Sequence, residues 1–572
     1  MLRKRLIISV MLFVPLLYTA IAYSVGLPLP QFMDGTYNAV AFAAVQIIIS
    51  AAIMAVNRQY FISGFDGLVH KAPNMDTLVA AGSAAAFIYS IFAAAMIAWE
   101  LSAGNTGEVQ AYSADILFGS AGTILTLVTT GKYMESSLMS AGESISPELD
   151  MEGRVEDGPN APIVKLAERI GGIFIPAVML LALLTVTVWL LAGQTFGFAL
   201  SMAISVLLIS CPSALLLAAP VAMTVGTGIG TENGILFKSG ESLEKAHGID
   251  TVFLDKTGTV TKGKPRVVMG TIVPGMTKAD LFTVSASIES MSEYPLAEAI
   301  VRLAKEKNLK LRTLNEFEAV SGKGARAVIG EKKYILGNIS FLEANGIDCT
   351  SAYSVADNFV AMAATPVFLA GEGKLMGAMG IADEIRPTIK AAVKELETMG
   401  LEVIMLTGDN KKMADVLAEK LGFTGAIPLV LHGNKEKVIK KAQETGKLIA
   451  LAADGVKDVQ ALAVADVGIA VGVGDGVFET ADIALLKDDP LDIATAIKLS
   501  KAVIKNIKQN LIAAFFYNLI AIPIAAGVMY PLIGLKLDPV VAAAAMSLCS
   551  FCAVAYALRL RDFTPLLTCQ NL

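Results

Sequence analysis

Apolar and polar positions divide the chain into two kinds of sequence. Runs long enough to cross a bilayer, roughly 20 residues each, occur at about 5–26, 36–56, 74–98, 112–131, 170–193, 197–222, 508–530 and 536–558. Between about 230 and 505 the apolar runs become short and alternate with charged segments. The pattern predicts a multi-span α-helical membrane protein with about eight transmembrane helices and one large aqueous insertion.

Basic residues are unevenly distributed among the connections between these spans. The loops near 27–35, 99–111 and 194–196 contain no lysine or arginine, whereas the opposite connections carry many (Arg3, Lys4, Arg5, Arg58, Lys71, Lys132, Arg559 and Arg561). The positive-inside rule therefore predicts that both termini and the insertion face the cytoplasm, and we expect the plasma membrane. The first run is too long for a signal peptide, and we expect it to be retained.

Within the insertion, short apolar runs alternate with helical patterns. The runs at 251–254, 401–406, 447–452 and 467–471 are typical of strands in a parallel, doubly wound α/β sheet. In such sheets the chemistry lies at the carboxyl ends of the strands, so we expect the polar residues that follow them to converge (Asp255, Thr407, Asp409 and Asp454). We interpret the segment between about 270 and 375 as a second, α+β domain inserted into the first.

The residues expected at this edge of the sheet suit phosphoryl transfer. A carboxylate such as that of Asp255 can accept a phosphoryl group as an aspartyl phosphate. Asp454 offers a second carboxylate for Mg²⁺, and Lys435 offers an ammonium that neutralises developing charge. One aspartate after a strand is more often a turn or a helix cap, but polar motifs at three strand ends together favour the chemistry.

The motifs DKTGT at 255–259 and TGDN at 407–410 resemble those of the P-type ATPases, ion pumps that cycle through a phosphoaspartate. ISCPSAL at 209–215 and PNMDTLVAAG at 73–82 are similar to motifs of the heavy-metal subfamily. Tyr517-Asn518, and Met546 followed by Ser550, are similar to the copper-transporting group. The resemblance covers most of the chain and implies ATP and Mg²⁺ as cofactors and Cu(I) as the transported ion.

The resemblance also implies a role for each matching residue. For catalysis it implies Asp255, Lys256, Thr257, Thr407, Gly408, Asp409, Lys435, Asp458 and Glu143, with Asp255, Thr257 and Asp454 holding Mg²⁺. For the nucleotide it implies Glu293, Tyr294, Gly322, Gly324 and Asn338. For the transported ion it implies Cys211, Tyr517, Asn518, Met546 and Ser550.

The domain organisation follows from the spans and the resemblance. We expect transmembrane helices 1–4 at 1–134, a truncated actuator-like linker at 135–168, helices 5–6 at 169–230, helices 7–8 at 506–562 and a tail at 563–572. A haloacid-dehalogenase-like phosphorylation domain is expected at 231–268 and 376–505, and the nucleotide-binding domain at 269–375. The chain opens on its first span, so we expect no N-terminal metal-binding domain.

The membrane residues also suit a soft metal on chemical grounds. Cu(I) prefers thiolate and thioether ligands, and Cys211 lies beside Pro212, which breaks a helix and frees backbone groups at a cavity. Met546 and Ser550 are four residues apart and share one helix face, although methionine is also common core filler. Cys549 and Cys552 lie at helical spacing where the family pattern has serines; they are either a second soft-metal pair or small packing residues.

The sequence departs from the family at four places: one is in the fourth span, where Gly119 follows Phe118 in place of a glutamate, and the other three lie outside the spans. Where the family has an actuator domain, this chain has only about residues 135–165, which are too few for an independent core. The AGES segment at 141–144, with Glu143, is either a remnant of the loop that removes the phosphate or a chance match. Tyr294 replaces the histidine that stacks on adenine, but it keeps an aromatic face. Lys457 replaces an asparagine next to the phosphate.

Three functions remain to be distinguished. The first is an ATP-driven exporter of Cu(I), to which we expect a soluble metallochaperone to deliver the ion and another chain to supply the missing actuator function. The second is a degenerate relative that binds ATP and metal as a sensor, buffer or accessory subunit without pumping. The third, a membrane-anchored phosphatase, is disfavoured because Thr257 stands where such enzymes carry their acid. A net charge of −6 argues against nucleic acid as a partner.

Overall fold

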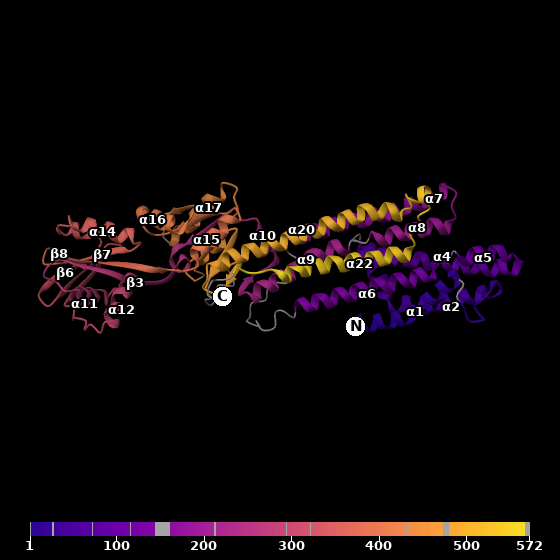
Figure 1. Cartoon of the computed structure of the whole chain (residues 1–572), viewed down its shortest axis with the longest axis horizontal. Helices are drawn as coiled ribbons and strands as arrows, with labels where there is room; N and C mark the ends of the chain where they lie inside the picture. The colour runs from indigo at the N-terminus through magenta and orange to yellow at the C-terminus, as the bar shows by residue number, and fades with distance from the viewer. Residues whose placement is uncertain are drawn as a thin grey trace.

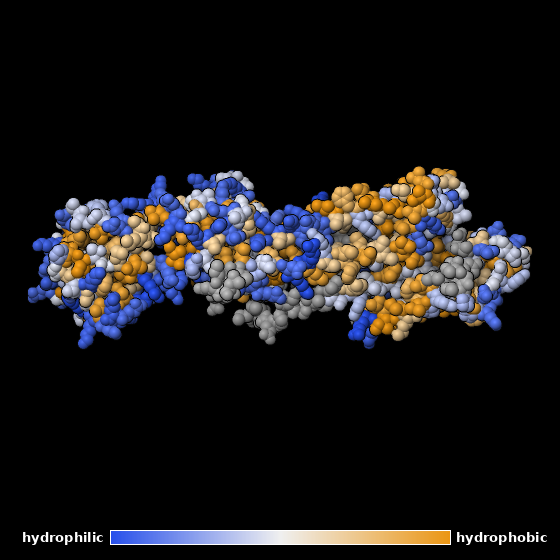
Figure 2. All heavy atoms as spheres, in the orientation of Figure 1, coloured by the Kyte–Doolittle hydropathy of each residue, from blue (hydrophilic) through white to orange (hydrophobic). Residues whose placement is uncertain are grey.

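The computed structural model describes residues 2–566 except 26–27, 71–72, 115, 144–160, 211–212, 293–294, 321, 431, 455 and 473–479. The molecule is elongated: long helices form one end, and two sheets with their helices follow one another toward the other (Figure 1). Apolar surface is concentrated on the helical end, and the sheet-bearing part is mostly hydrophilic (Figure 2). This division agrees with the predicted membrane protein carrying a large aqueous insertion.

The helical part contains α1 (Leu2–Val25), α2 (Ala39–Val56), α3 (Arg58–Val69), α4 (Met75–Ala103), α5 (Thr106–Ala114), α6 (Phe118–Glu143), α7 (Pro162–Leu191), α8 (Phe196–Ile209), α9 (Ser213–Glu232), α20 (Leu491–Ala525), α21 (Tyr530–Ile533) and α22 (Pro539–Leu558). Among the described residues, six helical segments are long and apolar enough to cross a membrane, and α8 is a shorter apolar helix. The chain is therefore a multi-pass membrane protein. The predicted run 197–222 is divided between α8 and α9, on either side of Pro212, which cannot donate a helical hydrogen bond.

A seven-stranded sheet forms the middle of the molecule. Its order is β1 (Ile235–Phe237), β13 (Ile483–Leu485), β12 (Val467–Val471), β11 (Ile449–Asp454), β2 (Thr251–Asp255), β9 (Glu402–Leu406) and β10 (Gly425–Ile427). Every pairing is parallel except β1 with β13. The connecting helices are α10 (Gly240–His247), α15 (Ile389–Thr398), α16 (Lys411–Leu421), α17 (Lys435–Gln443) and α18 (Val459–Val464). The predicted parallel α/β domain is confirmed.

A second sheet is inserted between β2 and β9. It is antiparallel, in the order β3 (Thr261–Ile272), β8 (Lys374–Ile385), β7 (Thr365–Gly371), β6 (Lys332–Gly337), β5 (Gly324–Ile329) and β4 (Glu316–Val320). Its helices are α11 (Lys278–Glu289), α12 (Pro295–Glu306), α13 (Ile339–Ala344) and α14 (Ala352–Ala361). The paired strands β3 and β8 connect the two sheets, and the predicted limits 269 and 375 fall inside these strands.

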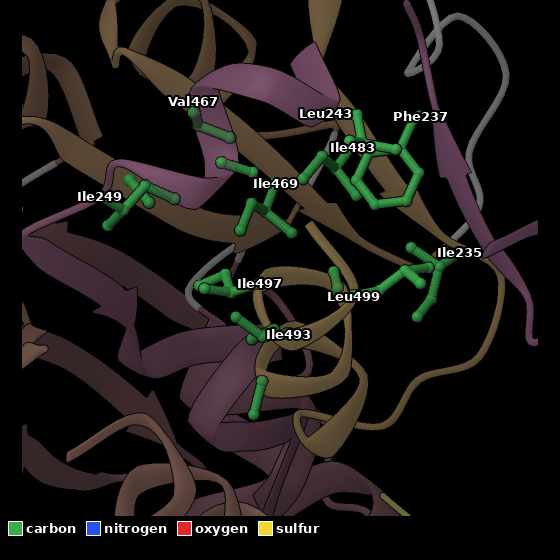
Figure 3. Close-up of a cluster of buried hydrophobic side chains, with 14 of the residues drawn as sticks. Ile235, Phe237, Leu243, Ile249, Val467, Ile469, Ile483, Ile493, Ile497 and Leu499 are labelled. Carbon is green, nitrogen blue, oxygen red and sulfur yellow. The ribbon is translucent and has the colours of Figure 1, made fainter. Parts of the chain in front are cut away.

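The core of the middle domain continues into the membrane helices. Strand residues such as Ile469 and Ile483 pack against Ile493 and Ile497 in the first turns of α20 (Figure 3). The same buried cluster includes Val554 and Ala557 near the end of α22 and Leu560 just after it. Because protein interiors are close-packed, the sheet and the adjoining ends of these two helices form one packed unit.

Candidate functional site

The strand order brings the predicted phosphate residues to one edge of the first sheet. β2 ends at Asp255 and lies between β9, which is followed by Thr407, and β11, which ends at Asp454. Parallel neighbours end on the same side, at the usual position of a site in this sheet class. The structure therefore groups the DKTGT, TGDN and DG segments.

Lys435 lies at the centre of this group. Its Nζ is 2.8 Å from Asp255 Oδ1 and 2.8 Å from Asp458 Oδ2, and the three side chains are exposed by 2%, 5% and 1% respectively. Lys435 is the first residue of α17, and Asp458 immediately precedes α18. Buried charges are tolerated only when they are paired and hydrogen-bonded, so these contacts indicate a fixed cation against the carboxylate of Asp255.

The turn after β2 is shaped by Gly258. Its φ of +90° suits glycine, and a Cβ at this position would lie 3.3 Å from Asp454 Oδ2. The turn thus approaches the second carboxylate closely. Within the same turn, Lys256 Nζ is 2.8 Å from Asp409 Oδ2, an ion pair that connects the DKTGT and TGDN segments.

The backbone around Thr407 is also held in place. Its hydroxyl accepts a hydrogen bond from the Asp409 N–H at 3.1 Å, and its carbonyl accepts one from the Val430 N–H at 2.9 Å. The Thr407 side chain is buried, whereas Gly408 is exposed at the edge of the site. The exposed N–H side of this turn is therefore the part that a phosphate oxygen could reach.

The carboxylates suit a hard divalent cation. Asp454 is half-buried, and its Oδ1 accepts a hydrogen bond from the Val456 N–H at 3.0 Å. Its other oxygen, Oδ2, faces the Gly258 turn and lies 3.4 Å from Lys457 Nζ. Mg²⁺ prefers one or two carboxylates together with phosphate and water oxygens, so Asp454 and Asp255 fit this ion, with Lys457 as a local competitor.

Two residues at the joint between the sheets were not found from the sequence. Arg386 donates to the Gly258 carbonyl at 3.0 Å and to the Thr261 carbonyl at 3.2 Å. Asp383 accepts from the N–H groups of Gly263 and Lys264, both at 2.9 Å. They lie more than 100 residues from the turn they support, and the only local signal is a charged ADEIRP segment before a helix.

In the second sheet the glycines permit close backbone approach. A Cβ at Gly324 would lie 2.1 Å from the Leu336 carbonyl oxygen, and Gly322 has a φ of +71°. Asn338 donates from Nδ2 to the Gly322 carbonyl at 3.3 Å and caps α13 by accepting from the Phe341 N–H at 2.9 Å. Glu293 and Tyr294 lie outside the described residues.

Glu289, at the end of α11, is a further residue that the sequence did not indicate. Its carboxyl is buried, and burial raises its pKa, an effect that a hydrogen bond with Ser292 partly opposes. Raised carboxyl pKa values are frequent at functional sites. Glu289 precedes the predicted nucleotide residues by only a few positions.

Four of the predicted metal ligands lie on α20 and α22. Met546 and Ser550 are buried on α22, with exposures of 3% and 8%. Tyr517 packs against the core cluster that contains Met546. Asn518 is half-buried, and its Oδ1 has no hydrogen-bond partner among the described residues, which is costly in a membrane unless a ligand uses it. Cys211 and the side chain of Glu143 lie outside the described part of the chain.

Comparison with known proteins agrees with this arrangement. A family model for haloacid dehalogenase-like hydrolases matches residues 249–466. Copper-exporting P-type ATPase of Staphylococcus saprophyticus is 34% identical over 97% of this chain and 80% of its own length. Copper-transporting ATPase 2 of Rhizobium meliloti is 40% identical over 77% of this chain and 54% of its own length.

A solved structure shares the fold. A zinc-transporting PIB-type ATPase in an E2.Pi state matches with a TM-score of 0.61 at 23% identity, over 96% of this chain and 99% of that one. The chain spans only 54–66% of the length of several curated relatives. The alignment with the Staphylococcus saprophyticus protein runs over 659 residues, more than the 572 of this chain, so some of the relative's residues have no counterpart here.

Proposed function

Because the chain belongs to the family of copper-exporting P-type ATPases, we propose that it uses ATP to export Cu(I) from the cytoplasm through an aspartyl phosphate at Asp255. The observation that carries this proposal is the buried group in which Lys435 bridges Asp255 and Asp458 at 2.8 Å each. A surface aspartate in a turn would need no such cation. The group suits a carboxylate that gains and loses a doubly charged phosphoryl group.

In this proposal the Asp255 carboxylate attacks the γ-phosphorus of ATP, an acyl phosphate bond forms, and ADP leaves with the electron pair of the broken bond. Lys435 neutralises charge on the transferring oxygens, while the N–H groups near Gly408 hydrogen-bond to them. Thr257 and Lys256 line the approach from the turn, and the Lys256–Asp409 ion pair keeps the two loops together. Asp458 holds Lys435 in position.

Mg²⁺ would be held by Asp255, Asp454 and Thr257, and when bound it neutralises phosphate charge. The residues of the second sheet would bind the nucleotide, with Gly322, Gly324 and Asn338 forming a glycine-bordered turn and Glu293 and Tyr294 contacting the base. A Cβ at Gly322 would meet no atom within 4 Å, so this part of the turn has an open surface, which supports contact with a flat ring.

For the transported ion we propose the ligands Cys211, Tyr517, Asn518, Met546 and Ser550. The half-buried Asn518, whose Oδ1 has no hydrogen-bond partner in the described part of the chain, and the buried Met546 support this group. Sulfur ligands select a soft ion such as Cu(I). The interruption between α8 and α9, where Cys211 lies in the sequence, supports a cavity at that depth.

A second function has one specific observation in its favour. α6 ends at Glu143 and α7 begins at Pro162, so few residues are available for the actuator function that removes the phosphate. The second function is that of a protein that forms the phosphoenzyme but does not hydrolyse it alone, and that acts as a sensor, buffer or accessory subunit. A partner chain that supplies the actuator function would restore pumping.

We further propose the plasma membrane as the location, with both termini and both sheets in the cytoplasm. The basic residues on one set of connections support this orientation. The start of α1 also lies at the end of the helical part that is nearer to the sheets (Figure 1). A soluble metallochaperone is the expected source of Cu(I), because free Cu(I) binds thiols indiscriminately.

The test is Cu(I)-dependent ATP turnover by the purified full chain, with Asp255→Asn as the control. Steady turnover that disappears in Asp255→Asn supports an exporter. An acid-stable phosphoenzyme without turnover supports the second function. Absence of any ATP-derived phosphoenzyme at Asp255 would contradict both.

A further inference from the structure

Two thiols line a cavity between α20 and α22. The cavity has a volume of about 570 Å³, and Cys549 and Cys552 both face it from α22. Both cysteines are free, Cys549 half-buried and Cys552 exposed. Residues three apart on a helix lie on the same side with Cβ atoms about 5–6 Å apart, so rotation about χ1 can bring the two sulfurs to one ion.

The cavity lies beside the group proposed for the transported ion. Tyr517 lines the cavity from α20 and also packs against the cluster that contains Met546. Met546 precedes Cys549 by three residues, which is less than one helical turn. The two sets of sulfur atoms therefore occupy neighbouring faces of α22, with Met546 directed into the core and the thiols toward the cavity.

Hydrogen bonds hold the walls of this cavity together. Asn510 donates from Nδ2 to the Ala553 carbonyl at 3.1 Å, and the Tyr556 hydroxyl donates to Gln509 Oε1 at 2.6 Å. Both bonds connect α20 to α22. They fix the spacing of the helices on which the thiols lie, much as hydrogen bonds around a metal centre orient its ligands.

We propose that Cys549 and Cys552 form a second Cu(I) site in this cavity, next to the transport ligands. Soft thiolates prefer Cu(I) over hard divalent ions, and each thiol gives up its proton to solvent when it binds the ion. The choice of Cu(I) rests on the proposed function, whereas the site itself rests on the thiol pair and the cavity. The protein then holds one Cu(I) more than the transport ligands alone account for.

The test is the stoichiometry of Cu(I) bound by the purified full chain under anaerobic conditions, in competition with a chromophoric Cu(I) chelator. We expect Cys549→Ser/Cys552→Ser to bind one ion fewer than the wild type. Cys349→Ser is the matched control, because Cys349 is a free thiol buried in the second sheet domain, and it should bind as many ions as the wild type. Equal stoichiometry in the double variant and the wild type would overturn the proposal.

A measurement on the unmodified chain covers the case in which the double variant does not fold. Brief alkylation with N-ethylmaleimide, read by mass spectrometry, should label Cys552 in the metal-free protein, and stoichiometric Cu(I) should reduce that labelling at least tenfold. Unchanged labelling of Cys552 in the presence of Cu(I) would contradict the site.

Failure of the export proposal gives a different result. If the wild type shows no Cu(I)-dependent phosphorylation of Asp255 but still loses one ion in the double variant, the thiol site stands and the exporter does not. If phosphorylation depends on Cu(I) but the ion count is unchanged by the double variant, the exporter stands and the thiol site does not.

Discussion

Replacing Lys435 by methionine tests whether the buried ion group organises the middle domain. The change keeps an unbranched side chain of similar length and removes the positive charge that Asp255 and Asp458 share. Two buried carboxylates then lose the cation that bridges them. We expect the domain to be strongly destabilised and phosphorylation of Asp255 to be lost.

The size of the effect follows from the geometry. At an effective dielectric constant of about 20, unit charges at the observed 2.8 Å attract by about 6 kcal/mol per contact. Much of this attraction is offset by the desolvation of the three groups. Removal of one member of a buried ion group typically lowers the free energy of unfolding by about 3–5 kcal/mol. Since about 1.4 kcal/mol is a factor of ten, opening of the sheet should become roughly 10² to 4 × 10³ times more frequent.

Native-state hydrogen exchange of the full chain measures this directly, because peptides from β2 and β11 report the opening of the sheet. Lys447→Met is the matched control: Lys447 pairs with Glu402 at 2.7 Å at the opposite end of the same sheet, but the two side chains are 44% and 47% exposed. An exposed pair contributes at most about 1 kcal/mol, so exchange should change little.

A double-mutant cycle tests whether Lys435 bridges Asp255 and Asp458. Asp458→Asn should lower the free energy of opening the sheet much less in the Lys435→Met background than in the wild type, because the Lys435 ammonium is already absent there. If Lys435→Met leaves exchange in β2 unchanged, or if the two substitutions are additive, the bridging role of Lys435 is wrong.

Three further predictions concern the same two domains. Lys457→Asn should lower the Mg²⁺ concentration for half-maximal phosphoenzyme formation several-fold, because Lys457 Nζ lies 3.4 Å from Asp454 Oδ2; Lys457→Arg should not, and equal Mg²⁺ dependence in all three proteins would refute the competition. Gly258→Ala should reduce phosphoenzyme formation at least tenfold, whereas Gly275→Ala, which has the same backbone strain (φ +98°) but open space around it, should leave it intact. Burial raises the pKa of Glu289 above its ordinary value of 4.5, so the folded state holds this proton more tightly and its stability falls as pH rises from about 4.5 through the folded pKa. Glu289→Gln should therefore be more stable than the wild type near pH 7–8, and the difference in stability should vanish near pH 4. Hydrogen exchange of α11 measures this difference. A difference in stability that does not change with pH would show that the Glu289 carboxyl is not its cause.

Local patterns were sufficient to predict the first sheet and the edge at which Asp255, Thr407 and Asp454 come together. Short apolar strands followed by polar turns indicate parallel strands, whereas the order of the strands came only from the structure. Lys435 was expected as a candidate ammonium. Its bridge to Asp458 follows from α17 and α18 packing beside each other, which no local pattern encodes. The supports at Asp383 and Arg386 were missed for the same reason, since they act across 120 residues or more of intervening chain.

Helix limits in the membrane part were predicted less well than the spans. The hydrophobic run that begins near 508 marks only the apolar half of α20, which starts at Leu491. A window of hydropathy detects where a helix meets lipid, whereas the helix itself continues as long as its backbone hydrogen bonds do. The first half of α20 is packed against the sheet, and because it carries four lysines its sequence pattern indicated the soluble block.

The helix α20 is continuous from the sheet core into the membrane part. At 1.5 Å per residue, the 35 residues of Leu491–Ala525 measure about 52 Å, with one end clamped in the sheet core and Tyr517 and Asn518 toward the other. A rigid rod transmits rotation without loss, so a tilt of about 10° at the clamped end displaces the region of Asn518, about 40 Å away, by roughly 7 Å. In the proposed exporter, this one helix would therefore couple phosphorylation at the sheet to ion coordination near Asn518.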